Sequence, residues 1–254
     1  RAAGDMGAMR RILIIGGGAI GLGLAYHLAR AGSVSVTLLE RNTLTSGTSW
    51  HAAGIVGPLR ATPNMTRLAM YAGELFPRLE AESGMSTGYR RTGGYWLARE
   101  TARMDELQRI AALGRHFGLT PSIVGPADVA VPGLDLSGVI GAMHVAEDAN
   151  VNPVDLCMAY ARQARTMGAE IRENTPVARL TVEGGRVTGA LLVDGSHVAA
   201  DLVALCAGAW SRQLAAGAGV ALPLQAVEHM YVVTEPMPQM PHSSPSPVFI
   251  SASV

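Results

Sequence analysis

The sequence predicts an α/β fold that opens with a strand, a glycine-rich turn, a helix and a second strand. Residues 11–15 are an apolar run typical of a buried parallel strand, and residues 34–39 have the same character. Gly16-Gly17-Gly18 follows the first strand and leads into residues 19–31, where apolar side chains recur at helical spacing and Gly32 marks the end. This order predicts a βαβ unit, the building block of a Rossmann-like domain.

Helices and strands alternate after a loop, residues 43–58, that is rich in small residues. We expect helices at residues 64–83, 101–117 and 153–167, and strands at residues 89–98, 170–173, 177–182, 187–193 and 202–205. Asn152-Pro153 is a strong helix start, because Asn caps a helix and Pro suits its first position. Gly184-Gly185, between two strands, indicates a hairpin.

The chain is long enough, at 254 residues, for two interleaved domains. A loop-rich stretch around Pro126 and Pro132 indicates that the chain leaves its first domain, builds part of a second and returns near Asn152. We therefore predict a discontinuous nucleotide-binding domain at residues 10–85 and 145–220. A partial second domain is expected at residues 86–144 and 221–254.

The composition argues against several classes of partner. Lys plus Arg equals Asp plus Glu at 20 each, so the basic excess that nucleic acid or an anionic membrane requires is missing. No apolar run approaches the roughly 20 residues of a membrane span, and no signal peptide is visible, which predicts a cytoplasmic protein, or a matrix protein in a mitochondrion. Cys157 and Cys206 lie far apart and are expected to be reduced, buried packing residues. No histidine has a metal-ligand pattern, so no metal is predicted.

The turn after the first strand has the spacing Gly16-x-Gly18-x-x-Gly21. Gly16 allows the tight turn, Gly18 lets the backbone approach a pyrophosphate, and Gly21 lets the helix pack closely on the strand. The helix N-terminus presents free N–H groups and a partial positive charge to phosphates. Glu40, at the end of the second strand, is placed to accept ribose hydroxyls, which favours a 2′-hydroxyl over a 2′-phosphate. The sequence therefore predicts that this unit binds the ADP half of a dinucleotide.

The fingerprint alone does not distinguish FAD from NAD. In many NAD enzymes another βα repeat follows directly, whereas here Thr45-Ser46-Gly47-Thr48-Ser49-Trp50-His51-Ala52-Ala53-Gly54 intervenes. A loop of such small residues suits an extended cofactor that is contacted through backbone N–H groups, and this favours FAD.

At these residues the chain resembles the D-amino-acid-oxidase superfamily of flavoproteins, and within it the dimethylglycine and sarcosine dehydrogenase/oxidase group. The segments that carry the resemblance are Glu40-Arg41, residues 47–54, Val151-Asn152-Pro153 and residues 227–236, and it extends from about Arg10 to the end of the chain. The resemblance implies an FAD domain interleaved with a substrate domain built on an antiparallel sheet. It also implies oxidation of a secondary or tertiary amine, such as dimethylglycine or sarcosine, by hydride transfer to flavin N5.

The fingerprint and the resemblance together assign cofactor-binding positions. They are Gly16, Gly18, Ala19, Ile20, Gly21, Glu40, Arg41, Thr48, Ser49, Trp50, His51, Gly54, Ile55, Val177, Ala207, Gly208 and Trp210. His51 matches the histidine that is bonded covalently to the flavin 8α-methyl carbon, and the alternative is a non-covalent histidine that packs or forms hydrogen bonds. Val177 matches a valine whose backbone meets the adenine, with an ordinary core valine as the alternative. Trp210 follows the third FAD segment and has packing as its alternative.

His229 matches the family's active-site histidine near the flavin. An amine must be neutral to release hydride, and a histidine with a pKa near neutrality can take its proton or position it. The alternative is a structural histidine in a strand. Tyr231, two residues further on, is a weaker candidate for lining the same pocket.

The resemblance stops at Val254, whereas the family's later segments supply a catalytic tyrosine and the rest of the substrate sheet. We therefore expect a fragment, a split subunit or a truncated product, and open sheet edges that a second chain would cover. The acceptor of the flavin's electrons is expected to be oxygen or a carrier protein. Two alternatives remain: a non-catalytic regulatory or partner subunit, and another superfamily enzyme such as an amino-acid oxidase or glycerol-3-phosphate dehydrogenase, against which residues 49–54 argue.

Overall fold

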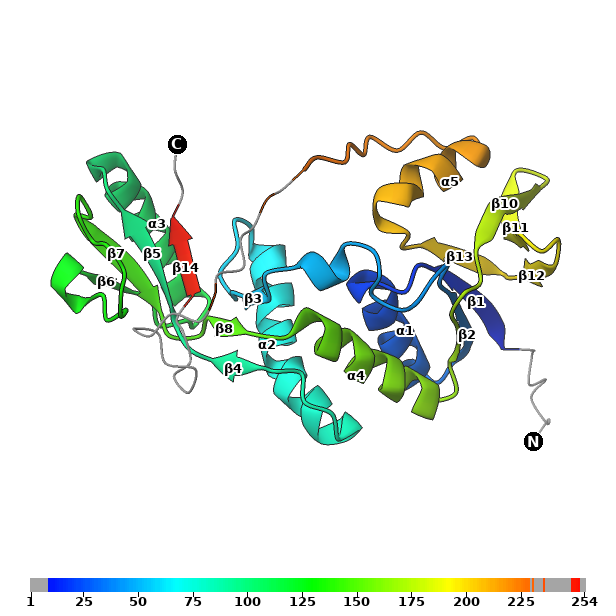
Figure 1. Cartoon of the computed structure of the whole chain (residues 1–254), viewed down its shortest axis with the longest axis horizontal. Coiled ribbons are helices and arrows are strands. Elements are labelled where there is room, and N and C mark those ends of the chain that lie inside the picture. The colour runs from blue at the N-terminus through cyan, green and yellow to red at the C-terminus, as the bar shows by residue number, and fades with distance from the viewer. Residues whose placement is uncertain (1–8, 229, 231–234, 236–247, 252–254) are drawn as a thin grey trace, which may run out of the picture. The chain divides into compact units, whose positions relative to one another are not determined.

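A computed structural model describes residues 9–228, 230, 235 and 248–251 and confirms the α/β class (Figure 1). The described chain divides into two compact units. Unit 1 comprises residues 9–52, 79–86 and 153–228, and unit 2 comprises residues 53–78 and 87–152 with the described residues beyond 229. Their roles as FAD-binding and substrate domains stay a prediction.

Unit 1 is built on a four-stranded parallel sheet in the order β13-β1-β2-β9. A three-stranded antiparallel sheet, β10-β11-β12, completes its strands. The elements in chain order are β1 (Arg10–Ile15), α1 (Ala19–Ala31), β2 (Val34–Leu39), η1 (Ser49–His51), α4 (Pro153–Thr166), β9 (Glu170–Arg172), β10 (Val177–Glu183), β11 (Arg186–Leu192), β12 (His197–Ala199), β13 (Leu202–Leu205), η3 (Gly208–Trp210) and α5 (Ser211–Gly217).

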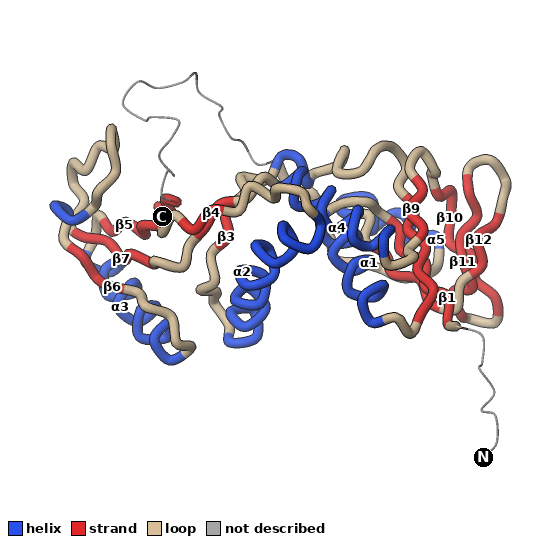
Figure 2. The backbone as a smooth tube through the Cα atoms, turned by 90° about the horizontal axis from the view of Figure 1, so that it is seen from below, coloured by secondary structure: helices blue, strands red, loops and turns tan. Residues whose placement is uncertain are grey.

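The parallel sheet of unit 1 is covered on both faces, as a run of consecutive apolar residues in a strand predicts. Helices α1 and α4 lie on one side of its strands, and β10–β12 lie on the other (Figure 2). Leu13, Ile15 and Leu39 of the parallel sheet pack with Leu180 and Leu192 of the antiparallel sheet in one buried cluster. Because β1 lies between β13 and β2, the turn that follows it opens at the middle of the sheet's carboxyl edge.

The predicted βαβ unit is confirmed. Helix α1 occupies the expected residues, and Gly32 ends it in the left-handed conformation, with its N–H donating to the carbonyl of Ala29 at 3.1 Å. The hairpin between β10 and β11 is also confirmed, since Gly184 and Gly185 both adopt positive φ in the turn.

Unit 2 has two small sheets, in the orders β14-β5-β7-β6 and β3-β8-β4. All their pairings are antiparallel except that β14 runs parallel to β5. The elements are β3 (Ile55–Val56), α2 (Pro63–Ser83, whose last residues belong to unit 1), β4 (Arg90–Arg91), β5 (Gly94–Ala98), α3 (Thr101–His116), β6 (Ser122–Val124), η2 (Pro126–Asp128), β7 (Gly141–Val145), β8 (Ala149–Asn150) and β14 (Val248–Ser251). Apolar side chains of α3 and β7, among them Leu107, Ala111 and Met143, form its main core.

The prediction of a single strand at residues 89–98 is wrong. The structure has two short strands there, β4 and β5. The backbone N–H groups of Thr92 and Gly93 both donate to the carbonyl of Asp148, at 3.2 and 2.9 Å. Gly93 also adopts a φ of 71°, which no regular strand contains. The chain therefore turns around Asp148 before β5 begins.

Candidate functional site: a nucleotide cavity at the glycine turn

The glycine turn after β1 leaves no room for side chains at two of its positions. Gly16 has a φ of 115°, and a Cβ atom there would lie 2.3 Å from the carbonyl oxygen of Cys206. A Cβ atom on Gly21 would lie 1.9 Å from the carbonyl oxygen of Gly16. Gly16 is therefore required for the turn and Gly21 for the close approach of α1 to β1, which are the roles that the fingerprint predicts.

Gly17 is a further required glycine, which the fingerprint leaves unspecified. A Cβ atom there would lie 2.6 Å from Leu44 Cδ2 and 2.9 Å from Glu40 Cβ. Its N–H donates to Glu40 Oε2 at 2.7 Å, while the N–H of Asn42 donates to Oε1 at 3.0 Å. The Glu40 carboxylate is thus held in place by two backbone donors at the end of β2 before any ligand binds.

The N-terminus of α1 opens toward a ligand. Gly18 caps it without a side chain, and the first turn of the helix itself holds no acidic residue, so its partial positive charge is available to an anion. Ser49 Oγ accepts a hydrogen bond from the N–H of Ala19 at 3.0 Å, and a Cβ atom on Gly18 would lie 2.9 Å from that oxygen. Because this hydroxyl accepts from Ala19, its own proton is free to point outward and donate to an anion.

Trp210 and Arg41 come from segments of unit 1 that are far apart in the sequence, and they meet at this site. The Arg41 guanidinium carbon lies 5.0 Å from the centre of the Trp210 ring, a cation–π distance. A Cβ atom on Gly47 would lie 3.5 Å from the same ring, so the 41–48 loop passes close to it. Ala207 precedes η3, and Trp210 is the last residue of this turn.

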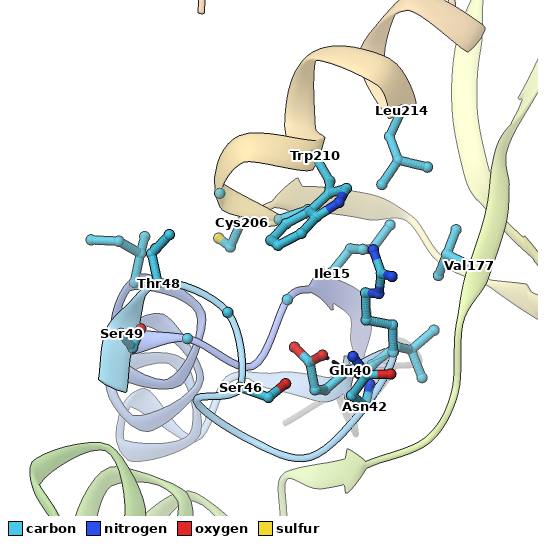
Figure 3. A pocket seen from close by; sticks show the side chains of 18 of the residues that line it. Ile15, Glu40, Asn42, Ser46, Thr48, Ser49, Val177, Cys206, Trp210 and Leu214 are labelled. Carbon is cyan, nitrogen blue, oxygen red and sulfur yellow. Dashed lines mark hydrogen bonds between the residues drawn. The ribbon is translucent and has the colours of Figure 1, made fainter. Parts of the chain in front are cut away.

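These groups surround one cavity of about 620 Å³ that lies wholly in unit 1 (Figure 3). Its size is in the range of a site for a cofactor or drug-sized ligand. Twelve of the predicted cofactor residues line it, namely Gly16, Gly18, Ala19, Ile20, Glu40, Arg41, Thr48, Ser49, Val177, Ala207, Gly208 and Trp210. The structure therefore brings together segments separated by more than 150 residues.

The cavity also has lining residues that sequence reasoning missed. They include Asn42, Ser46, Thr175, Arg179, Cys206, Gln213 and Leu214. The prediction of Val177 as a cofactor residue indicates that β10 approaches the site. A local sequence pattern does not show which neighbours of Val177 also face the cavity. Burial raises the pKa of the Cys206 thiol, which is half-buried rather than fully buried as expected. The thiol is therefore neutral near pH 7.

Five other predicted residues do not line this cavity. Gly21 is buried behind the turn, against the Gly16 carbonyl. Trp50 and His51 are exposed, and their rings lie 3.6 Å apart between centres. Gly54 and Ile55 belong to unit 2, where the carbonyl of Gly54 accepts a hydrogen bond from the N–H of Val151 at 2.8 Å. Their contact with a cofactor stays a prediction. The predicted His229 and Tyr231 lie outside the described residues.

The residues present fit the ADP half of FAD. The turn at Gly16 and Gly21 admits only backbone, the first turn of α1 holds no acidic residue, and a carboxylate stands at the end of β2. These are the features that bind a pyrophosphate and a ribose in a dinucleotide site. In the described part of the chain, no three His, Cys, Asp or Glu side chains are grouped in a way that would hold a metal ion.

Comparisons with known proteins place the chain in a family. The family model DAO, FAD dependent oxidoreductase, matches residues 11–253. The 4-methylaminobutanoate oxidase (formaldehyde-forming) of Paenarthrobacter nicotinovorans is 40% identical over 87% of this chain and 27% of its own length. Human mitochondrial sarcosine dehydrogenase is 36% identical over 88% of this chain and 25% of its own length. The mitochondrial pyruvate dehydrogenase phosphatase regulatory subunit of Mus musculus is 34% identical over 96% and 28%.

Solved structures agree with the sequence comparisons. Glycine oxidase from Bacillus cereus ATCC 14579 superposes with a TM-score of 0.68 at 28% identity, over 82% of this chain and 57% of that one. The chain spans about a quarter of the length of the curated relatives named above. Within the described residues, no helix is both long and apolar enough to cross a membrane. The glycine turn, its cavity and these matches together show that the chain belongs to the DAO family of FAD-dependent oxidoreductases.

Proposed function

We propose that the protein to which this chain belongs oxidises a secondary or tertiary amine of the N-methyl amino acid type with FAD. The observation that carries the proposal is the unit 1 cavity, in which the glycine turn, the α1 N-terminus and Glu40 are arranged as a dinucleotide requires. The names of its relatives, a 4-methylaminobutanoate oxidase and a sarcosine dehydrogenase, support an N-methyl amine as the substrate class.

We assign roles in binding the cofactor to the residues around this cavity. The N–H groups at the start of α1 and the Ser49 hydroxyl bind the pyrophosphate, and Glu40 accepts the ribose hydroxyls. Trp210 and Arg41 cover the nucleotide from the η3 side. Residues Thr48, Trp50, Gly54 and Ile55 meet the flavin portion through their backbone. When bound, FAD supplies the two-electron acceptor for oxidation of a carbon next to nitrogen.

We propose that His51 bonds covalently to the flavin and that His229 removes or holds the proton of the amine nitrogen. His51 lies in an exposed 3₁₀ turn, Ser49–His51, so its ring is accessible to a flavin. Acid precipitation of the purified protein tests the linkage. Yellow colour should remain in the pellet and move to the supernatant in His51→Ala. Colour in the supernatant of the unchanged protein would contradict the linkage but not FAD binding.

Anaerobic bleaching of the flavin tests the activity. Sarcosine, dimethylglycine and 4-methylaminobutanoate should each be compared for the rate at which the visible flavin absorbance falls, with His229→Gln expected to slow it at neutral pH. Reoxidation by air or by an added electron carrier then separates an oxidase from a dehydrogenase. A protein that carries no flavin at all would contradict the proposed function.

A regulatory role is the second candidate, because a phosphatase regulatory subunit is among the relatives at 34% identity. In that case flavin would bind, but none of the amines would bleach it. We propose in addition that unit 2 forms part of a substrate domain and that further chain, covalent or in a second subunit, completes it. Size-exclusion chromatography of the flavin-loaded chain, alone and with a candidate partner, measures whether the two form a complex.

A further inference from the structure

Asp148 is a buried carboxylic acid in unit 2 that the proposed chemistry does not use. It lies between β7 and β8, and its exposed fraction is 0%. Its backbone carbonyl accepts the N–H groups of Thr92 and Gly93, so the β4–β5 turn is tied to it. Directly after it, β8 pairs with both β3 and β4. Asp148 therefore sits where three separate chain segments of unit 2 meet.

The side chain is enclosed by two glycines and an indole. A Cβ atom on Gly94 would lie 2.3 Å from Oδ2, and one on Gly57 would lie 3.2 Å from Oδ1. Trp96 Nε1 donates to Oδ2 over a long 3.4 Å, and Oδ1 has no hydrogen-bond partner among the described residues. The glycines provide the space for this carboxyl group, and within the described chain the Trp96 indole is its one side-chain hydrogen-bond donor.

The charged groups around Asp148 do not form an ion pair with it in the described chain. Arg60, which follows β3, favours the carboxylate at a distance, and Glu147 disfavours it. Arg91 of β4 approaches Glu147 instead, at 3.7 Å. On β7, the Nε2 atom of His144 lies 2.8 Å from where a Cβ atom of Gly93 would be. Burial outweighs these influences and raises the pKa of Asp148 to about 6.

A buried carboxylate with one oxygen unpaired and the other on a single long hydrogen bond is costly, whereas the neutral acid costs far less. We infer that Asp148 is a protonation switch: the neutral acid holds the β3–β8–β4 junction together, and its ionisation loosens that junction. Gly57 follows β3 directly and lies beside the Asp148 carboxyl group, so we expect residues 54–58 to become less tightly held when Asp148 ionises. An effect of this switch on the cofactor rests on the proposed function, in which Gly54 and Ile55 contact the flavin.

The sign of the pH effect follows from the raised pKa. Below pH 4 the folded and unfolded chains both hold the proton, and the full stability is present. Between pH 4 and 6 the unfolded chain releases the proton first, so stability falls as the pH rises, and above about pH 6 the loss is complete. A pKa of about 6 against an ordinary 3.8 predicts a change of roughly a hundredfold in the folding equilibrium constant.

Asp148→Asn removes the titration while keeping the shape of the side chain. Its thermal midpoint should exceed that of the unchanged protein at pH 7.5, and this difference should shrink steadily toward pH 4.5. Asp105→Asn, an exposed position on α3 of the same unit, is the matched control and should show no such pH dependence. A difference for Asp148→Asn that stays constant from pH 4.5 to 7.5 would overturn the inference.

A second measurement keeps Asp148 in place and uses Trp96 as the reporter. In a Trp50→Phe/Trp210→Phe background, the fluorescence of Trp96 should titrate with a midpoint near pH 6, and adding Asp148→Asn should abolish that titration. A flat signal between pH 5 and 7 overturns the inference even if Asp148→Asn fails to fold. Both measurements use protein without added cofactor, so their outcome does not depend on whether the flavin proposal is correct.

Discussion

The N–H of Gly17 and the carboxylate of Glu40 form a 2.7 Å hydrogen bond that joins the glycine turn to the end of β2. The bond places the acid beside the turn without help from a ligand. It also accounts for the glycine at position 17, since any side chain there would overlap Glu40 and Leu44. The glycine turn and the acid at the end of the second strand, two parts of a dinucleotide fingerprint, are thus directly hydrogen-bonded to each other in this protein.

Glu40→Ala should weaken FAD binding by about 10- to 100-fold, because a hydrogen bond to a charged group contributes roughly 1.5–3 kcal/mol. The substitution leaves the Gly17 N–H without its acceptor and removes the group proposed to accept the ribose hydroxyls. Equilibrium titration of flavin fluorescence on the apoprotein, in a His51→Ala background where the proposed covalent bond does not form, measures the affinity. Glu40→Gln keeps one acceptor and should lose less, and Glu170→Ala, an exposed acid on β9 of the same sheet, should lose nothing. Equal losses for Glu40→Ala and Glu170→Ala would refute the assignment.

Gly21→Ala should destabilise unit 1 severely, whereas Gly23→Ala on the same helix should stabilise it. The added methyl group at position 21 would lie 1.9 Å from the Gly16 carbonyl oxygen, so α1 would have to move away from the turn. At position 23 the nearest atom is Tyr160 Cε2 at 4.0 Å, and replacing a helical Gly by Ala gains up to about 1 kcal/mol. Chemical denaturation followed by circular dichroism measures both. Similar midpoints for the two variants would show that the close approach at Gly21 is not required.

Ser49→Ala should lower stability by about 1 kcal/mol, the usual effect of losing a side-chain acceptor at a helix N-terminus. The lost contact is the 3.0 Å hydrogen bond from the N–H of Ala19. FAD affinity should fall as well, since the hydroxyl is proposed to donate to the pyrophosphate. Ser46→Ala is the matched control, because Ser46 lines the same cavity from the same loop. If both variants lose stability and affinity alike, the contact with Ala19 has no special role.

Trp210→Ala should weaken FAD binding by roughly 2- to 5-fold, as expected from a partly exposed cation–π contact of about 0.5–1 kcal/mol. Trp210→Phe keeps an aromatic face for Arg41 and should retain most of the affinity. Arg41→Gln should match Trp210→Ala, and the double variant should be no worse than either single one. Additive losses in the double variant would mean that the two side chains act independently.

The first half of the cofactor site could be predicted from local sequence, because each glycine role depends on backbone geometry within one βαβ unit. Gly16, Gly21 and Glu40 lie where the fingerprint puts them. Val177, Ala207 and Trp210 came from the family resemblance, and the fold brings them to the same cavity. Arg179, Gln213 and Leu214 carry no local pattern, so only the packing of β10 and α5 around the cavity reveals them.

The sequence by itself determined the α/β class, the order of the first strand, turn, helix and strand, and the family. The class and the order of elements follow from periodicity and from glycines whose conformation no other residue adopts easily, whereas the family follows from the resemblance at residues 47–54 and the other matching segments. Only the tertiary structure decided the requirement for Gly17, the pairing of Arg41 with Trp210 and the enclosure of Asp148 by Gly57 and Gly94. Each depends on the distance between residues far apart in the chain, and such distances arise from packing rather than from any local pattern.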